Sequence, residues 1–120
     1  MNNTVKPTPE FKRDLKPLLK KYRSLKDTVL NLEEALIKDP YLGESYGHGI
    51  YKVRVSDVSK GKGKGKSGGF RVLYYHLTKT AYGIDMLLLN IIDKSEVATI
   101  KKPDAVKQLN AILKEYFNRE

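Results

Sequence analysis

Two alternating segments on either side of a lysine–glycine run constrain the fold of this chain most strongly. The segment Ile50 to Val55 reads IYKVRV, and the segment Phe70 to Tyr75 reads FRVLYY. In an extended strand, successive side chains point to opposite faces of a sheet, so each segment has two distinct faces. The run between them is too polar and too rich in glycine to pack. The sequence therefore predicts a β-hairpin whose loop, at residues 59–69, is exposed and mobile.

The hairpin carries most of the positive charge of the chain. Between Lys52 and Arg71 there are seven basic residues and one acidic residue, which gives +6 (7 − 1) of the formal net charge of +9. A cationic face beside a glycine-rich loop is suited to binding RNA or DNA, whose phosphate charge dominates affinity. The alternative interpretation is solubility by net charge alone. Scattered charge would favour that alternative, whereas clustered charge favours an anionic partner.

The segment before the hairpin predicts a pair of helices. Thr8 followed by Pro9 is typical of a helix start, and an apolar stripe at helical spacing follows, made of Phe11, Leu15, Leu18 and Tyr22. Pro17 inside this stripe is expected to kink or split the helix. Residues 1–7 show no pattern and are expected to be disordered.

A second helix is predicted immediately after the first. Ser24 with Asp27 resembles a capping box at its start, and the Asp39-Pro40 pair is expected to end it, because a residue before proline avoids the helical region. The two helices are expected to form an antiparallel hairpin whose apolar faces cover one side of a sheet.

The remaining elements complete an α+β domain. Tyr41–Gly49 is expected to be a loop, and the apolar segment Ile84–Ile92 to be a strand in the middle of the sheet. A last helix is expected after Lys102-Pro103. The predicted order is α-α-β-β-β-α: an N-terminal α-hairpin packed on a small antiparallel sheet, with a C-terminal helix, in one domain that spans residues 1–120.

Several functional classes are excluded at this point. The apolar runs fall far short of the roughly 20 residues that span a bilayer, and no apolar signal core opens the chain, so a cytoplasmic protein is expected. The chain has no cysteine, and His48 and His76 lack ligand-like neighbours, so no metal or cofactor is expected. Gly65-Lys66-Ser67 resembles the end of a phosphate-binding P-loop. Lys60 stands where that pattern needs its first glycine, and a strand is predicted after it where the P-loop needs a helix. A nucleotide triphosphatase is therefore excluded.

The candidate site lies on the hairpin. Lys52 and Arg54 share a strand face, and pairing of the strands can bring Arg71 beside them. A two-metal nuclease needs a cluster of acids, which the hairpin lacks, so cleavage of a phosphodiester would use the 2′-hydroxyl of RNA as nucleophile. Cationic side chains would then stabilise the charge that grows on phosphorus, and a lysine or tyrosine would carry the proton. The alternative is a solvated outer sheet face without catalytic function.

Five segments between about Phe11 and Leu113 form a recognisable series by their order and spacing, without one decisive motif. They are FKRDLKPLLKKYRSL at Phe11–Leu25, the loop glycine of Pro40-Tyr41-Leu42-Gly43, IYKVRV at Ile50–Val55, KGKGKSGGFRVLYY at Lys62–Tyr75 and IIDKSE at Ile91–Glu96. In this series the chain resembles the RelE/HigB branch of the RelE–ParE superfamily, which contains toxins of bacterial type II toxin–antitoxin systems.

This resemblance implies a microbial-ribonuclease-like fold and an mRNA interferase. Such a toxin is a ribosome-dependent endoribonuclease that cuts mRNA in the A site by metal-free 2′-hydroxyl attack, inhibits translation and is held inactive by a cognate antitoxin. Lys52 and Arg54 match the paired basic strand positions of the family, which are implicated in activating the nucleophile and in stabilising the transition state. Arg71 matches its phosphate-contacting arginine, so the resemblance implies that these three residues are catalytic. Further RNA contacts are expected from Lys64, Lys66 and Lys94.

The chain also departs from the family pattern. Ile92 stands where many relatives have a tyrosine, Ser95 stands where RelE proper has an arginine, and Lys101-Lys102-Pro103 stands near the position of its catalytic tyrosine. The resemblance therefore leaves the general acid and base unassigned. The alternative hypotheses are a non-enzymatic toxin, either a ParE-like gyrase inhibitor or a homologue that only occupies ribosomes, and a general basic RNA-binding module.

Overall fold

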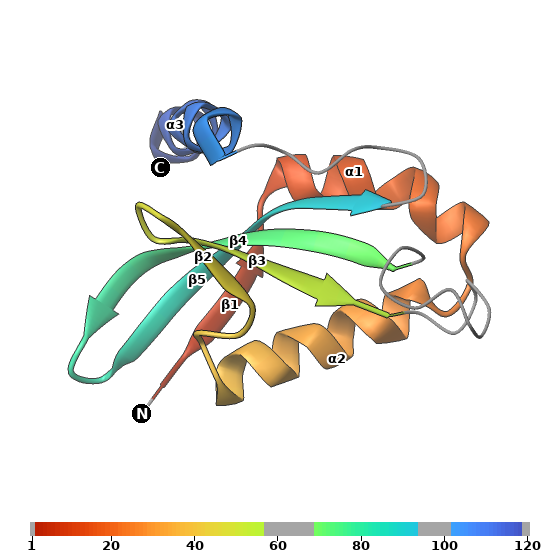
Figure 1. Cartoon of the computed structure of the whole chain (residues 1–120), viewed down its shortest axis with the longest axis horizontal. Coiled ribbons are helices and arrows are strands. Elements are labelled where there is room, and N and C mark those ends of the chain that lie inside the picture. Colours follow the sequence, from red (N-terminus) through yellow and green to blue (C-terminus); the bar gives the residue numbers. More distant parts are fainter. Residues whose placement is uncertain (1, 57–68, 94–101, 119–120) are drawn as a thin grey trace.

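The computed structural model describes residues 2–56, 69–93 and 102–118, whose arrangement is shown in Figure 1. These residues form three helices and one five-stranded sheet, so the predicted α+β class is confirmed. The elements in chain order are β1 (Thr4–Pro7), α1 (Pro9–Lys21), α2 (Leu25–Lys38), β2 (Glu44–Gly47), β3 (Ile50–Val55), β4 (Phe70–Thr80), β5 (Gly83–Asp93) and α3 (Lys102–Asn118).

The sheet is mixed rather than antiparallel, with the strand order β1-β5-β4-β3-β2. β1 pairs with β5 in parallel, whereas the other neighbouring strands are antiparallel. The expectation that residues 1–7 are disordered is therefore wrong for Thr4–Pro7. This segment has no apolar alternation of its own and is held by β5, where the Thr4 hydroxyl also donates to the Asp85 carboxylate at 2.6 Å.

The three predicted strands are confirmed and form the middle of the sheet. β3 pairs with β4 so that Arg54 lies directly opposite Arg71, and β4 and β5 form a long hairpin of 11 residues each. The predicted mobile loop at residues 59–69 lies outside the described residues except for Gly69, which is buried.

β2 is a strand where the sequence predicts a loop. It follows Gly43 and pairs with the first half of β3, where Glu44 lies opposite Lys52. Gly43 has a φ of +90°, and a Cβ atom at this position would clash with the backbone oxygen of Lys52. The close approach of the two backbones therefore requires glycine here.

The N-terminus of α1 forms as predicted. The Thr8 hydroxyl accepts from the backbone N–H of Phe11 at 3.1 Å and donates to the carbonyl of Leu88 at 2.8 Å, which fixes the helix start on β5. The predicted split at Pro17 does not occur, because α1 continues to Lys21. Pro17 is exposed, and proline in a helix removes one backbone hydrogen bond without preventing packing of the apolar face.

α2 begins and ends where the sequence predicts, but not with the predicted cap. Ser24 is at the N-cap position with helical backbone angles (φ −81°, ψ −4°), and its side chain makes no capping hydrogen bond. A capping side chain needs an extended backbone to reach the free N–H groups, so the capping-box prediction is wrong. Asp39 ends the helix, as predicted for a residue before Pro40.

The sheet separates two hydrophobic cores. α1 and α2 cover one face, onto which Val72 points, and α3 covers the other face, onto which Leu73 points. Figure 1 shows α3 separated from both other helices. Since Arg71 shares a face with Leu73, the predicted cationic site lies on the α3 side of the sheet.

Candidate active site

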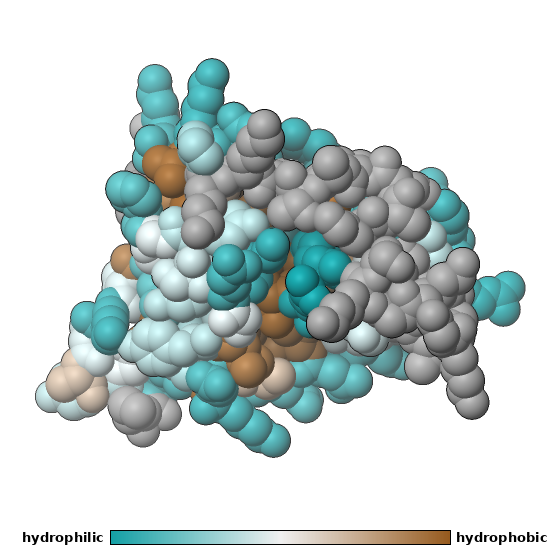
Figure 2. Space-filling model, in the orientation of Figure 1, coloured by the Kyte–Doolittle hydropathy of each residue, from teal (hydrophilic) through white to brown (hydrophobic). Residues whose placement is uncertain are grey.

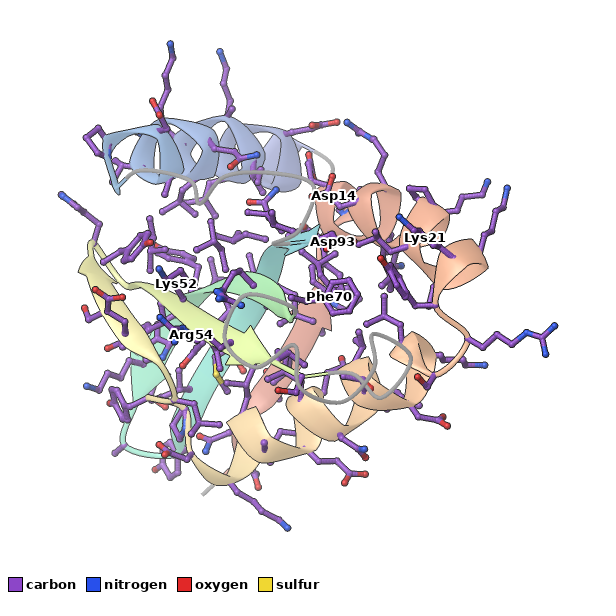
Figure 3. The ribbon with its side chains drawn as sticks, turned by 45° about the vertical axis from the view of Figure 1, so that its right-hand side comes forward. Asp14, Lys21, Lys52, Arg54, Phe70 and Asp93 are labelled. Atoms are coloured by element: carbon purple, nitrogen blue, oxygen red, sulfur yellow. The ribbon has the colours of Figure 1, made fainter. Side chains whose placement is uncertain are left out.

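β3 and β4 bring the three predicted cations together. Lys52 and Arg54 are two residues apart on one face of β3, and Arg71 is the cross-strand neighbour of Arg54. Figure 3 shows Lys52 and Arg54 close together on β3, well separated from Asp14, Lys21 and Asp93. The expected juxtaposition is therefore present, and the catalytic roles of these residues stay a prediction.

Arg71 differs from its neighbours because it is buried. Its side chain is 4% exposed, whereas Arg54 is exposed. The Nη1 atom of Arg71 donates to the carbonyl of Phe70 at 3.2 Å. Burial lowers the pKa of Arg71, and the nearby positive charge of Arg54 lowers it further. A phosphate bound at the surface would meet the exposed Arg54, with the buried Arg71 beside it on the neighbouring strand.

The face that carries these cations is not an open, solvated sheet face. Part of it is covered by α3, whose buried side chains pack with Ile50, Leu73 and Leu87, and these are Ala105, Leu109 and Ile112. The alternative of a solvated outer face therefore applies only to the part that α3 leaves open, where Arg54 is exposed. The cations of this face lie at the border between a packed core and solvent.

Lys52 is held by two neighbours on β2. Its Nζ atom lies 3.7 Å from the Glu44 carboxylate and 5.3 Å from the centre of the Tyr46 ring. The Lys52 side chain is 14% exposed, whereas that of Glu44 is 60% exposed. Lys52 therefore has a fixed position, and Glu44 faces solvent beside it.

A cavity of about 410 Å³ lies at this edge of the sheet. It is lined by Gly43, Glu44, Lys52, Val53 and Arg54. It forms where β2 ends its pairing with β3, because among the described residues no strand pairs with the outer edge of β3 beyond Lys52, while β4 pairs with its other edge. In the view of Figure 2, hydrophilic side chains border exposed apolar atoms near the middle of the molecule. The cavity offers two cations and one carboxylate to a ligand.

The other candidates from the sequence lie elsewhere. His76 stacks on Tyr51 at 4.6 Å, and its Nε2 atom lies 2.6 Å from the carbonyl oxygen of Pro40. Burial lowers the pKa of His76, and Tyr74 beside it bonds the carbonyl of Leu42, so this group has a structural role. His48 is exposed and is not among the residues that line the cavity. Three predicted RNA contacts lie outside the described residues: Lys64, Lys66 and Lys94.

A further cavity, of about 490 Å³, lies between α1 and β5 and contains none of the predicted site residues. The two acids that line this cavity make hydrogen bonds between elements. Asp14 accepts from the Asn90 amide at 3.1 Å, and Asp93 accepts from the Tyr22 hydroxyl at 2.9 Å. Burial raises the pKa of Asp14. These bonds tie α1 to the part of β5 that β1 does not reach.

Glu44 is the site residue that sequence reasoning missed. The glycines around Glu44 predicted a loop. Without a strand at this position, the sequence could not indicate which residue of the hairpin Glu44 would lie opposite. The available signal was a lone acid shortly before the basic strand.

No protein-family model matches the chain, and no curated protein matches it significantly.

Within residues 2–56, 69–93 and 102–118, no three or more His, Cys, Asp or Glu side chains gather where they could hold a metal ion. None of the helices in the described part of the chain is long and apolar enough to cross a membrane.

Proposed function

We propose that this chain is the toxin of a type II toxin–antitoxin system, a RelE/HigB-like endoribonuclease that cuts mRNA in the ribosomal A site. The observation that carries the proposal is the cavity at the edge of β3, which is lined by Lys52 and Arg54. The resemblance in segment order and the α+β fold support it. So does the cross-strand placement of Arg71 opposite Arg54.

In the proposed reaction, the 2′-oxygen of the RNA attacks the adjacent phosphorus and the 5′-oxygen of the next nucleotide leaves. The products are a 2′,3′-cyclic phosphate and a 5′-hydroxyl. Lys52 and Arg54 hold the phosphate and stabilise the charge that develops on its oxygens. Arg71 acts as a positioning residue, because its buried charge lies beside Arg54 on the neighbouring strand and adds to the positive potential of the site.

The partners follow from the same proposal. The ribosome and mRNA supply the polyanion, with Lys64, Lys66 and Lys94 as further RNA contacts, and a cognate antitoxin holds the toxin inactive in the cytoplasm. Because the hairpin concentrates positive charge, binding to ribosomes should weaken steeply as salt rises.

The test is primer extension on a defined mRNA incubated with the purified protein, with and without programmed ribosomes. The proposal predicts cuts at the A-site codon when ribosomes are present and an intact message when they are absent. Cuts that ignore the ribosome would contradict it.

A non-enzymatic toxin is the second candidate, and two observations favour it. Ile92 stands where relatives have a tyrosine, and Arg71 is buried rather than open to substrate. A protein that occupies the ribosome without cutting would leave the message intact on stalled ribosomes in the same assay. A gyrase inhibitor would instead damage DNA before translation stops.

A further inference from the structure

The cavity at the edge of β3 contains one group that can accept a proton. Of its five lining residues, Gly43 and Val53 have no ionisable side chain, and Arg54 keeps its proton in proteins. Lys52 lies between the Glu44 carboxylate and the face of the Tyr46 ring, and both of these neighbours attract a positive ammonium group. Lys52 is therefore suited to holding a phosphate, and Glu44 is the remaining candidate for the proton.

The position of Glu44 suits this role. Its carboxylate lies 3.7 Å from the Lys52 Nζ atom, and its side chain is 60% exposed toward solvent. A phosphate oxygen that binds Lys52 lies about 2.8 Å from Nζ. The attacking 2′-oxygen belongs to the same nucleotide, so it would come within reach of a side chain as long and as free as that of Glu44.

The main chain fixes where Glu44 stands. Glu44 lies directly opposite Lys52 in the β2–β3 pairing, and the preceding Gly43 packs against the Lys52 backbone too closely for any side chain. The carboxylate and the ammonium group are thus held together by strand pairing and not by their ion pair alone. Loss of the carboxylate should leave Lys52 in place.

We propose that Glu44 is the general base of the cleavage, an inference that rests on the proposed ribonuclease function. The Glu44 carboxylate takes the proton of the 2′-hydroxyl while the 2′-oxygen forms its bond to phosphorus. The bond from phosphorus to the 5′-oxygen breaks, and that oxygen leaves with a proton from solvent. Lys52 and Arg54 balance the negative charge of the phosphate throughout, which also allows a carboxylate to stand beside it.

The test compares Glu44→Gln with the wild-type protein on programmed ribosomes, measuring ribosome binding and the single-turnover cleavage rate separately. Glu34→Gln is the matched control, because it removes the same charge from the exposed side of α2. General bases contribute about 100- to 10,000-fold to a rate. We expect Glu44→Gln to lose that factor in cleavage while binding as well as the wild type or more tightly. Glu34→Gln should cleave normally.

A second variant separates a chemical role from an electrostatic one. Glu44→Ala should be equally slow, and added formate should restore part of its rate by supplying a small carboxylate to the vacated space. Circular dichroism spectra that match the wild type would show that both variants are folded.

The outcomes are distinct. Cleavage by Glu44→Gln at or above the wild-type rate would overturn the inference. Glu44 would then only weaken the positive charge of Lys52. A slow Glu44→Ala that formate does not rescue would also count against a base. If the wild-type protein itself leaves the message intact, the proposed function fails, and the inference fails with it.

Discussion

At the scale of single residues, Lys52 and Arg54 are expected to differ from the other cations of the chain. We predict that Lys52→Ala and Arg54→Ala each slow cleavage by about 100- to 1,000-fold, the usual cost of removing one group that stabilises transition-state charge. The single-turnover rate on programmed ribosomes measures this loss. Lys16→Ala removes an equal charge from the exposed face of α1 and should leave the rate unchanged. Equal rates for all three variants would contradict the site.

Arg71 is expected to serve both stability and activity. As a residue of the candidate site it is expected to support cleavage, and a side chain that is 4% exposed also supports the core. Arg71→Ala should therefore lower the free energy of unfolding by about 1–3 kcal/mol through lost buried hydrogen bonding, as well as lowering activity. Urea titration measures the first effect. An unchanged midpoint would show that Arg71 is not structurally buried in solution.

His76 is expected to make folding pH-dependent. Because burial lowers its pKa from the usual value of 6.5, the unfolded chain binds a proton more readily than the folded chain. The stability that neutral His76 contributes is thus present above about pH 6.5 and is lost as the pH falls below that value. Urea midpoints at pH 7.5 and 5.5 should show this loss. In His76→Phe, which cannot be protonated, the difference between the two pH values should shrink.

At the scale of elements, β2 is the part of the fold that builds the cavity, and Gly43 is its most constrained position. A Cβ atom on Gly43 would clash with the Lys52 carbonyl, whereas one on Gly47 would have no atom within 4 Å. Both glycines have positive φ. Gly43→Ala should therefore both strain and displace β2, lowering stability and activity together.

Gly47→Ala is the matched control, because it adds strain of about 1 kcal/mol without a clash. Thermal unfolding measures the two variants side by side. Equal losses in the two would mean that the Gly43 contact is not as close as the structure has it.

The sequence predicts the elements that have strong local signals and misses those that depend on a partner. The continuous apolar run of β5 and the Thr8 cap of α1 are both visible in the residues themselves. Strands β1 and β2 are four residues each and are polar or glycine-rich, so their structure comes from the neighbouring β5 and β3. The burial of Arg71 is a property of the folded chain that no local pattern of its basic segment specifies. Glu44 lies in the site because the register of β2 places it opposite Lys52, and the sequence does not show this register.

At the scale of the whole molecule, the two faces of the sheet differ in how far helices cover them. α1 and α2 complete a continuous core on one face, while α3 covers the other face and leaves the edge at Lys52 and Arg54 open. Lys52 and Arg54 therefore lie on a paired strand of the sheet, at its border with solvent. Such a placement gives a site fixed geometry together with access for a large polyanion.

The central claim is that this cavity promotes attack by the 2′-hydroxyl of RNA, and one measurement tests it most directly. Programmed ribosomes would carry either an all-ribose message or the same message with a single 2′-deoxynucleotide at the cut position in the A-site codon. The account predicts that the ribose message is cut, with a 2′,3′-cyclic phosphate on its upstream fragment, and that the deoxy message stays whole at that position. Equal cutting of both messages, or no cutting of either, would contradict it.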